Sequence, residues 1–191
     1  MWNLDLAFAD VVATSSDPRL GAIRLAWWRE RLEELDTGAE APAEPRLRAV
    51  ASELLPQGIA GEELSQLEDA WLPLLDTFPW DDRQAEGLKR RGRILFGIGA
   101  RLLEAGEREA QAAGEVWSLV DGALHCTDED SRIFLVGQAT HAVFQLPLNV
   151  EPKLRALTVL SALAAYDVCS VGRFGRGGAA LKHRFTGRFP R

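Results

Sequence analysis

Apolar residues recur at intervals of three and four along almost the whole chain, the spacing that places them on one face of an α-helix. The breaks between these stretches carry Pro, Gly and helix-capping residues rather than the alternating pattern of β-strands. Short connections between many helices predict an all-α protein, built as a single-domain antiparallel helical bundle. We expect helices over residues 2–14, 18–35, 46–55, 62–76, 82–104, 107–126, 131–145 and 152–171.

Capping residues support several of these boundaries. Asp17 has the acceptor side chain of an N-cap, and Pro18 follows at the first helical position, where a missing N–H loses no hydrogen bond. Asp81 or Asp82 is expected to cap the long helix in the same way. The stretch TGAEAPAEP, residues 37–45, has the composition of a linker.

The composition agrees with a folded helical domain. The chain has 191 residues, 47% of them hydrophobic, which is enough for one compact core and argues against disorder. Aromatic residues make up 8% of the chain, with one Tyr, which is low for a sheet protein. The two cysteines have no CxxC spacing and lie in apolar stretches, as reduced thiols of a cytosolic protein do. With no signal peptide or spanning segment in view, we expect a cytoplasmic location.

Charge is distributed unevenly along the sequence. The net charge is -6, yet no acidic residue follows Asp167, so that six cations near the end leave about -12 on residues 1–172. We therefore expect a helical domain over residues 1–171 and a basic C-terminal tail over residues 172–191, with a loop, one short helix and a frayed end. The tail can contact an anionic lipid surface or an acidic protein surface, or it can be disordered. Contact with a lipid surface would make the protein a peripheral membrane protein.

The helix over residues 18–35 contains two adjacent tryptophans among four arginines, and two stripes at helical spacing compete for the core. Leu20, Ile23 and Trp27 form one stripe. The second stripe consists of Arg24, Trp28, Arg31 and Leu35. We expect Trp27 to pack in the bundle and Trp28 to lie at its edge. In one interpretation Arg29 and Arg31 form ion pairs with acidic residues one turn further along the helix. In the other, Arg24 and Arg31 point into a groove and hold an anion, because guanidinium suits phosphate geometry.

Three stretches of the sequence resemble the squalene and phytoene synthase family. Residues 7–35, AFADVVATSSDPRLGAIRLAWWRERLEEL, are similar to a family segment in which an AF helix precedes an LG-x-IRL-x-WWR helix with an acidic end. GEVWSLVDGALHC, residues 114–126, lies where the family has its second substrate-binding helix, and ALKHRFTGRFPR resembles the C-terminal end of bacterial members. The resemblance implies an isoprenoid synthase fold and head-to-head joining of two prenyl diphosphates. Arg24, Trp28 and Arg31 are then the candidate substrate-binding residues.

The sequence departs from active members of that family in its acidic residues. Their chemistry uses aspartates four residues apart on facing helices to hold Mg²⁺, which neutralises the leaving diphosphate. No Asp-x-x-x-Asp occurs in this chain. Asp10 is the acidic residue in the first corresponding region, and Asp121, His125 and Glu129 fall near the second. Asp10 and Asp121 are the candidate metal ligands, or else ordinary polar residues on helix surfaces.

Two functional readings follow from this departure. In the first, the protein is a degenerate member that has lost condensation, needs no cofactor, and binds an isoprenoid lipid or a membrane-complex partner. The complex I assembly factors of mitochondria resemble it, because they keep the IR-x-x-WW helix and lack the aspartates. In the second, it is an active prenyltransferase with Mg²⁺ on Asp10 and Asp121. A plain helical scaffold without a ligand is a third class.

A run of cations lies in the segment over residues 88–103, LKRRGRILFGIGARLL. Nucleic-acid-binding helices usually belong to basic domains, whereas the body of this protein is acidic. We therefore expect a solvated basic edge, or a contact with an acidic partner, and no nucleic acid.

Overall fold

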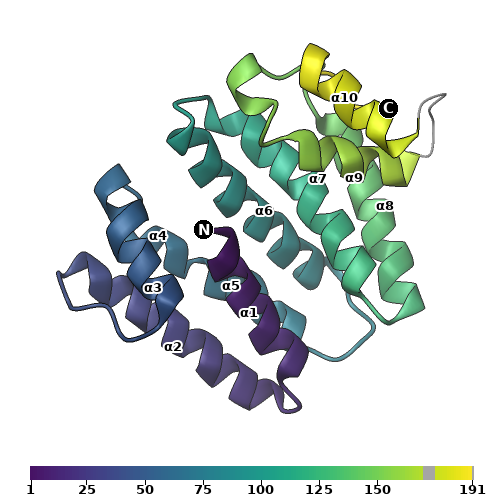
Figure 1. Ribbon diagram of the computed structural model, residues 1–191. Helices are drawn as coiled ribbons and strands as arrows, with labels where there is room; N and C mark the ends of the chain where they lie inside the picture. The colour runs from purple at the N-terminus through teal and green to yellow at the C-terminus, as the bar shows by residue number, and fades with distance from the viewer. Residues whose placement is uncertain (170–174, 191) are drawn as a thin grey trace. The chain divides into compact units, whose positions relative to one another are not determined.

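The computed structural model describes residues 1–169 and 175–190, and every regular element in this part of the chain is a helix (Figure 1). This confirms the expected all-α class. The chain divides into two compact units, Met1–Thr77 and Phe78–Arg191, here called unit 1 and unit 2. The expected boundary at residue 171 rested instead on the change in charge along the sequence.

Unit 1 begins with two long helices and continues as short helical segments. The elements are α1 (Trp2–Thr14), α2 (Pro18–Asp36), α3 (Pro45–Ala49), the π-helix η1 (Val50–Leu54), the 3-10 helix η2 (Leu55–Gln57), α4 (Gly61–Ser65), α5 (Leu67–Trp71) and the 3-10 helix η3 (Leu72–Leu75). The helices expected over residues 46–55 and 62–76 are therefore broken into shorter pieces. Pro56 and Pro73 contribute to the breaks, because a proline inside a helix removes a backbone donor.

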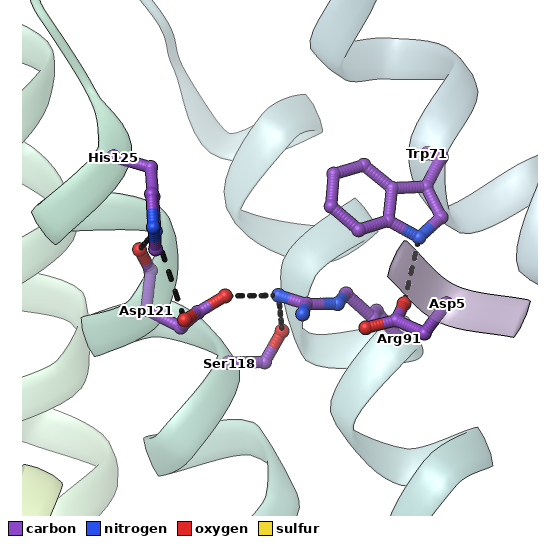
Figure 2. Close-up of polar contacts among 6 residues, drawn as sticks. All are labelled: Asp5, Trp71, Arg91, Ser118, Asp121 and His125. Carbon is purple, nitrogen blue, oxygen red and sulfur yellow. Dashed lines mark hydrogen bonds and ion pairs between the residues drawn. The ribbon is translucent and has the colours of Figure 1, made fainter. Parts of the chain in front are cut away.

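The short helices of unit 1 are held by side chains from distant parts of its sequence. The Asp36 carboxylate, at the end of α2, accepts hydrogen bonds from the backbone N–H groups of Gly61 at 2.7 Å and Glu62 at 2.8 Å, and so caps α4. A Cβ atom on Gly61 would lie 2.0 Å from the carbonyl oxygen of Leu32, so α2 and α4 approach each other backbone to backbone. In the core of unit 1, the indole Nε1 of Trp71 donates to the buried carboxylate of Asp5 at 2.9 Å (Figure 2).

Unit 2 consists mainly of long helices. They are α6 (Asp82–Leu102), α7 (Glu107–His125), α8 (Glu129–Gln145), the 3-10 turn η4 (Pro152–Leu154), α9 (Val159–Cys169) and α10 (Arg176–Thr186). Asp81 caps α6 through a capping box with Gln84, as its position in the sequence predicted. The helix expected over residues 152–171 was wrong at its start, because Pro152 opens a 3-10 turn and α9 begins at Val159. The expected end at residue 171 lies outside the described residues.

The two longest helices of unit 2, α6 and α7, lie side by side (Figure 1). A Cβ atom on Gly92 would lie 2.1 Å from the carbonyl oxygen of Gly114, and one on Gly114 would lie 2.2 Å from the carbonyl oxygen of Gly92. Two glycines facing each other thus allow the helix backbones to touch. This contact fixes the relative position of the α6 and α7 side chains described below.

α10 confirms the short helix expected within residues 172–191, whereas the residues that follow it, 187–190, are packed and not frayed as expected. α10 lies against α9, and His183 is fully buried. The Nδ1 atom of His183 donates to the backbone carbonyl of Arg188 at 3.1 Å, and its ring lies 4.6 Å from the ring of Phe189. The backbone N–H of Val150 donates to the carbonyl of Gly187 at 3.0 Å. Hydrogen bonds and ring packing therefore hold this segment. The remaining residues of the expected tail, 172–174 and 191, lie outside the described part.

Candidate functional site

The buried face of α2 is not the one expected from the sequence. Trp28 is 7% exposed and packs against Phe8, with 6.0 Å between the ring centroids, whereas Trp27 is 40% exposed. The expected placement of the two tryptophans was therefore inverted. The reason is tertiary, because a Cβ atom on Gly21 would lie 2.5 Å from the Leu75 side chain, so the Gly21 side of the helix faces inward. The buried face consists of Gly21, Leu25, Trp28, Leu32 and Leu35.

A side of α2 next to the buried face presents apolar residues to solvent. We call this surface the α2 outer face; it consists of Leu20, Ile23, Arg24, Trp27 and Arg31, which follow the spacing of a single helical stripe. Leu20 is 59% exposed and Ile23 is 66% exposed. An aliphatic and aromatic stripe of this kind, with arginines beside it, is suited to contact with an apolar group that carries negative charge.

Arg24 is the cation on this face that has no acidic partner in the described residues. Its Nη1 atom donates to Thr14 Oγ1 at 3.1 Å and to Ser15 Oγ at 3.4 Å. Both hydroxyls donate in turn to backbone carbonyls of α1, those of Asp10 and Val11, and this orients their lone pairs toward the guanidinium. Arg24 is thereby held at the C-terminal end of α1, where the helix dipole favours a cation. Its positive charge stays available to an anion.

Arg31 forms the ion pairs that the alternative reading of this helix predicted. Its Nη2 atom lies 2.7 Å from the Glu34 carboxylate and 3.8 Å from that of Glu30. These acidic neighbours largely compensate its charge, so Arg31 is less suited than Arg24 to hold an anion. Trp28, the third candidate substrate-binding residue, is in the core, and Trp27 is the tryptophan that a ligand can reach.

The two candidate metal ligands belong to different units. Asp10 is exposed on α1 of unit 1, and its backbone carbonyl accepts a hydrogen bond from Thr14. Asp121 lies on α7 of unit 2, where its carboxylate accepts a hydrogen bond from Arg91 Nη1 at 2.6 Å (Figure 2). His125, one turn further along α7, has its Nδ1 atom 3.6 Å from the Asp121 carboxylate and 2.8 Å from the Asp121 carbonyl oxygen. An arginine is thus the main partner of this carboxylate.

Arg91 is buried, contrary to the expectation of a solvated basic edge over residues 88–103. Instead of lying on a solvated edge, its side chain is buried between α6 and α7, with the guanidinium carbon 4.5 Å from the centroid of the Trp117 ring. Its Nη1 atom also lies 3.5 Å from Ser118 Oγ. The spacing of Leu88, Arg91 and Leu95 is the signal that places Arg91 on the buried face of α6.

A buried cation requires compensation, because moving a guanidinium out of water carries a large desolvation penalty. Asp121 supplies a negative charge at hydrogen-bonding distance, and the Trp117 ring offers a cation–π contact. Asp121 therefore has a structural role as the counter-ion of Arg91. Binding of Mg²⁺ by Asp121 would have to compete with this ion pair.

Among the residues that the structure describes, no three His, Cys, Asp or Glu side chains form a group that could hold a metal ion. In the same residues, no helix has both the length and the apolar composition needed to cross a membrane. Comparisons with known protein families, curated proteins and solved structures find no match for this chain. The resemblance to squalene and phytoene synthases therefore remains a prediction from the sequence.

Proposed function

We propose that this protein is a squalene/phytoene synthase-like helical protein that binds an isoprenoid diphosphate on the α2 outer face and does not condense it. One observation carries the proposal. Arg24, with no acidic partner in the described residues, lies beside an exposed apolar stripe on a helix that contains the LGAIRLAWWR sequence.

The chemistry of this face matches the two parts of such a ligand. An isoprenoid diphosphate has an anionic head, which a guanidinium can bind with two parallel hydrogen bonds. Its branched apolar chain would cover Leu20, Ile23 and Trp27, a stripe about 10 Å long at the rise of an α-helix. Removing these exposed side chains from water supplies the favourable free energy of the apolar contact.

The acidic residues support binding over condensation. The chain contains no Asp-x-x-x-Asp, and the Asp121 carboxylate already compensates Arg91. A departing diphosphate needs cations held by several carboxylates, and the residues proposed for that role are Asp10 and Asp121 alone. The active prenyltransferase is therefore the less favoured reading.

Titration calorimetry with farnesyl diphosphate tests the proposal. We expect the protein to bind, and Arg24→Gln to weaken binding about 10- to 100-fold, the value of a hydrogen bond to a charged group. Arg48→Gln is the matched control, because Arg48 is an exposed cation of unit 1 on another helix, α3. Equal affinity of the two variants would remove Arg24 from the site. If farnesyl diphosphate does not bind at all, the proposal fails, and a protein partner from a membrane complex becomes the preferred occupant of the stripe.

A further inference from the structure

α10 presents a second surface on which cations and apolar side chains alternate. We call it the α10 outer face; Leu181, Arg184 and Phe185 follow one another at helical spacing, Lys182 lies beside them, and Arg188 comes just after the helix, which ends at Thr186. Phe185 is 73% exposed, and Leu181 is also exposed. The opposite side of α10 carries the buried residues Ala179 and His183. α10 therefore packs one side against unit 2 and presents both cations and apolar side chains to solvent on the other.

The cations of this face are not neutralised by the protein. Arg176, at the start of α10, pairs with Asp167 at 3.0 Å. In the part of the chain that the structure describes, no acidic side chain forms an ion pair with Lys182, Arg184 or Arg188. Because no acidic residue follows Asp167 in the sequence, α10 itself brings none to this face. The surface is therefore locally positive on a chain whose net charge is negative.

A cavity adjoins the same face. It has a volume of about 350 Å³ and is lined by Leu148, Lys182, Arg188 and Phe189. Two cations and two apolar side chains therefore surround one space. The cations suit a phosphate group, and the apolar side chains suit the hydrocarbon attached to such a group.

The α10 outer face is formed before any ligand binds. Arg155 Nη1 donates to the backbone carbonyl of Phe185 at 2.7 Å, which satisfies a carbonyl in the last turn of the helix. Gly187 follows in the left-handed conformation with φ 72°, and its N–H donates to the His183 carbonyl at 2.7 Å. A Cβ atom at Gly187 would lie 2.5 Å from the carbonyl oxygen of Val150, so the end of α10 is tightly seated. Binding does not have to pay for folding of this helix.

We infer that the α10 outer face and its cavity bind the surface of an anionic phospholipid membrane, with a lipid phosphate between Lys182 and Arg188. Leu181 and Phe185 enter the interfacial region, where apolar side chains beside basic ones bind most strongly. Exposed aliphatic and aromatic groups favour this occupant over a nucleic acid, whose surface offers phosphates but little hydrocarbon. The inference does not depend on what occupies the α2 outer face.

Vesicle co-sedimentation of the full chain tests the charge contribution. We expect binding to vesicles of phosphatidylglycerol and phosphatidylcholine, little binding to phosphatidylcholine alone, and weaker binding as salt is raised. Lys182→Gln with Arg188→Gln should weaken binding about 30-fold, at about fivefold for each charge. Arg108→Gln removes an exposed cation from the first turn of α7 and should leave binding unchanged. If Arg108→Gln weakened vesicle binding as much as the double variant does, net charge and not this face would govern binding. That result would overturn the inference.

Two further arms separate the membrane from other anionic ligands. Phe185→Ser should weaken vesicle binding about tenfold. Because the Phe185 side chain is exposed, the melting temperature of the variant should equal that of the wild type. If the protein binds inorganic phosphate but does not bind vesicles, the cavity is a site for free phosphate, and the inference of membrane binding is wrong. Double-stranded DNA bound more tightly than vesicles, with no effect of Phe185→Ser, would contradict it as well. Arg24→Gln should leave vesicle binding intact, so failure of the proposed isoprenoid site and failure of this one remain distinguishable.

Discussion

Units 1 and 2 differ in how their helices are held and in the charge they carry. Apart from α1 and α2, the helices of unit 1 have five residues or fewer, whereas α6, α7 and α8 of unit 2 have 21, 19 and 17. Residues 1–77 contain six basic and 15 acidic residues, and residues 78–191 contain 16 basic and 13 acidic ones. Unit 1 therefore relies on caps from distant side chains, whereas unit 2 relies on backbone contact between long helices.

The difference also separates the two candidate binding surfaces. Arg24 is one of six basic residues in a unit with 15 acidic ones, so its field is short-ranged and suits a small anionic ligand with an apolar tail. The α10 outer face belongs to a unit with an excess of basic residues and suits an extended anionic surface.

The largest effect is expected at the glycine contact of unit 2. Gly92→Ala places a Cβ atom 2.1 Å from the Gly114 carbonyl oxygen, so α6 and α7 must separate, and we expect a loss of about 3 kcal/mol. Gly137→Ala on α8 is the matched control, because a Cβ atom there meets nothing within 4 Å. It should raise stability by up to about 1 kcal/mol. Denaturant unfolding of both variants measures the change in the free energy of unfolding. If this change had the same sign in both variants, the role of the contact would be refuted.

The ion pair between Arg91 and Asp121 should have the next largest effect. Asp121→Asn weakens the compensation of a buried guanidinium, and we expect a loss of about 2 kcal/mol in the free energy of unfolding. If Asp121 were a catalytic metal ligand with no structural role, the same variant would lose turnover and keep its melting temperature. Thermal unfolding together with an assay for diphosphate release decides between these outcomes.

Unit 1 offers a smaller, local test. Asp36→Ala removes the carboxylate that caps α4, and we expect a loss of about 1 kcal/mol. Hydrogen exchange should become faster at Gly61 and Glu62 and remain unchanged in α6 and α7. Glu40→Ala, in the exposed loop that follows α2, is the control substitution of an acidic residue. Equal effects of the two variants would argue against the cap.

The smallest expected effect is a pH dependence in unit 2. Burial is the main cause that lowers the pKa of His183 below its ordinary value of 6.5, and the nearby Arg155 charge lowers the pKa further. The unfolded chain then binds this proton more readily, so the stability contributed by neutral His183 is complete above pH 6.5 and is lost as the pH falls below it. Chemical unfolding between pH 7 and 5 should show this slope in the wild type and in His141→Gln, an exposed histidine. The slope should shrink in His183→Gln; an unchanged slope would assign it to other groups.

The sequence predicted helix boundaries well where a capping residue close to the boundary determines them. α1 was predicted at its observed boundaries, and the start of α2 follows from Asp17 and Pro18, because Asp17 accepts the N–H of Arg19 as an N-cap does. Asp81 likewise marks the start of α6. These boundaries depend on residues within one turn of each other.

Features set by distant contacts could not be predicted in the same way. Both expected stripes of α2 satisfy helical spacing, yet the contact between Gly21 and Leu75, 54 positions apart, turns a third set of residues, Gly21, Leu25, Trp28, Leu32 and Leu35, inward. Gly92 and Gly114 belong to different helices, and the sequence around neither glycine predicts their contact. The run of arginines in α6 is typical of an exposed segment, although Arg91 points inward and contacts Trp117. The helix over residues 18–35 was therefore predicted correctly, and its buried face was predicted wrongly.

The most direct test of the central claim, binding without condensation, is calorimetry with farnesyl diphosphate in the absence and presence of Mg²⁺, with diphosphate release followed in parallel. We expect the same affinity in both conditions and no release of diphosphate. Binding that requires Mg²⁺, accompanied by diphosphate release, would contradict it and establish an active prenyltransferase.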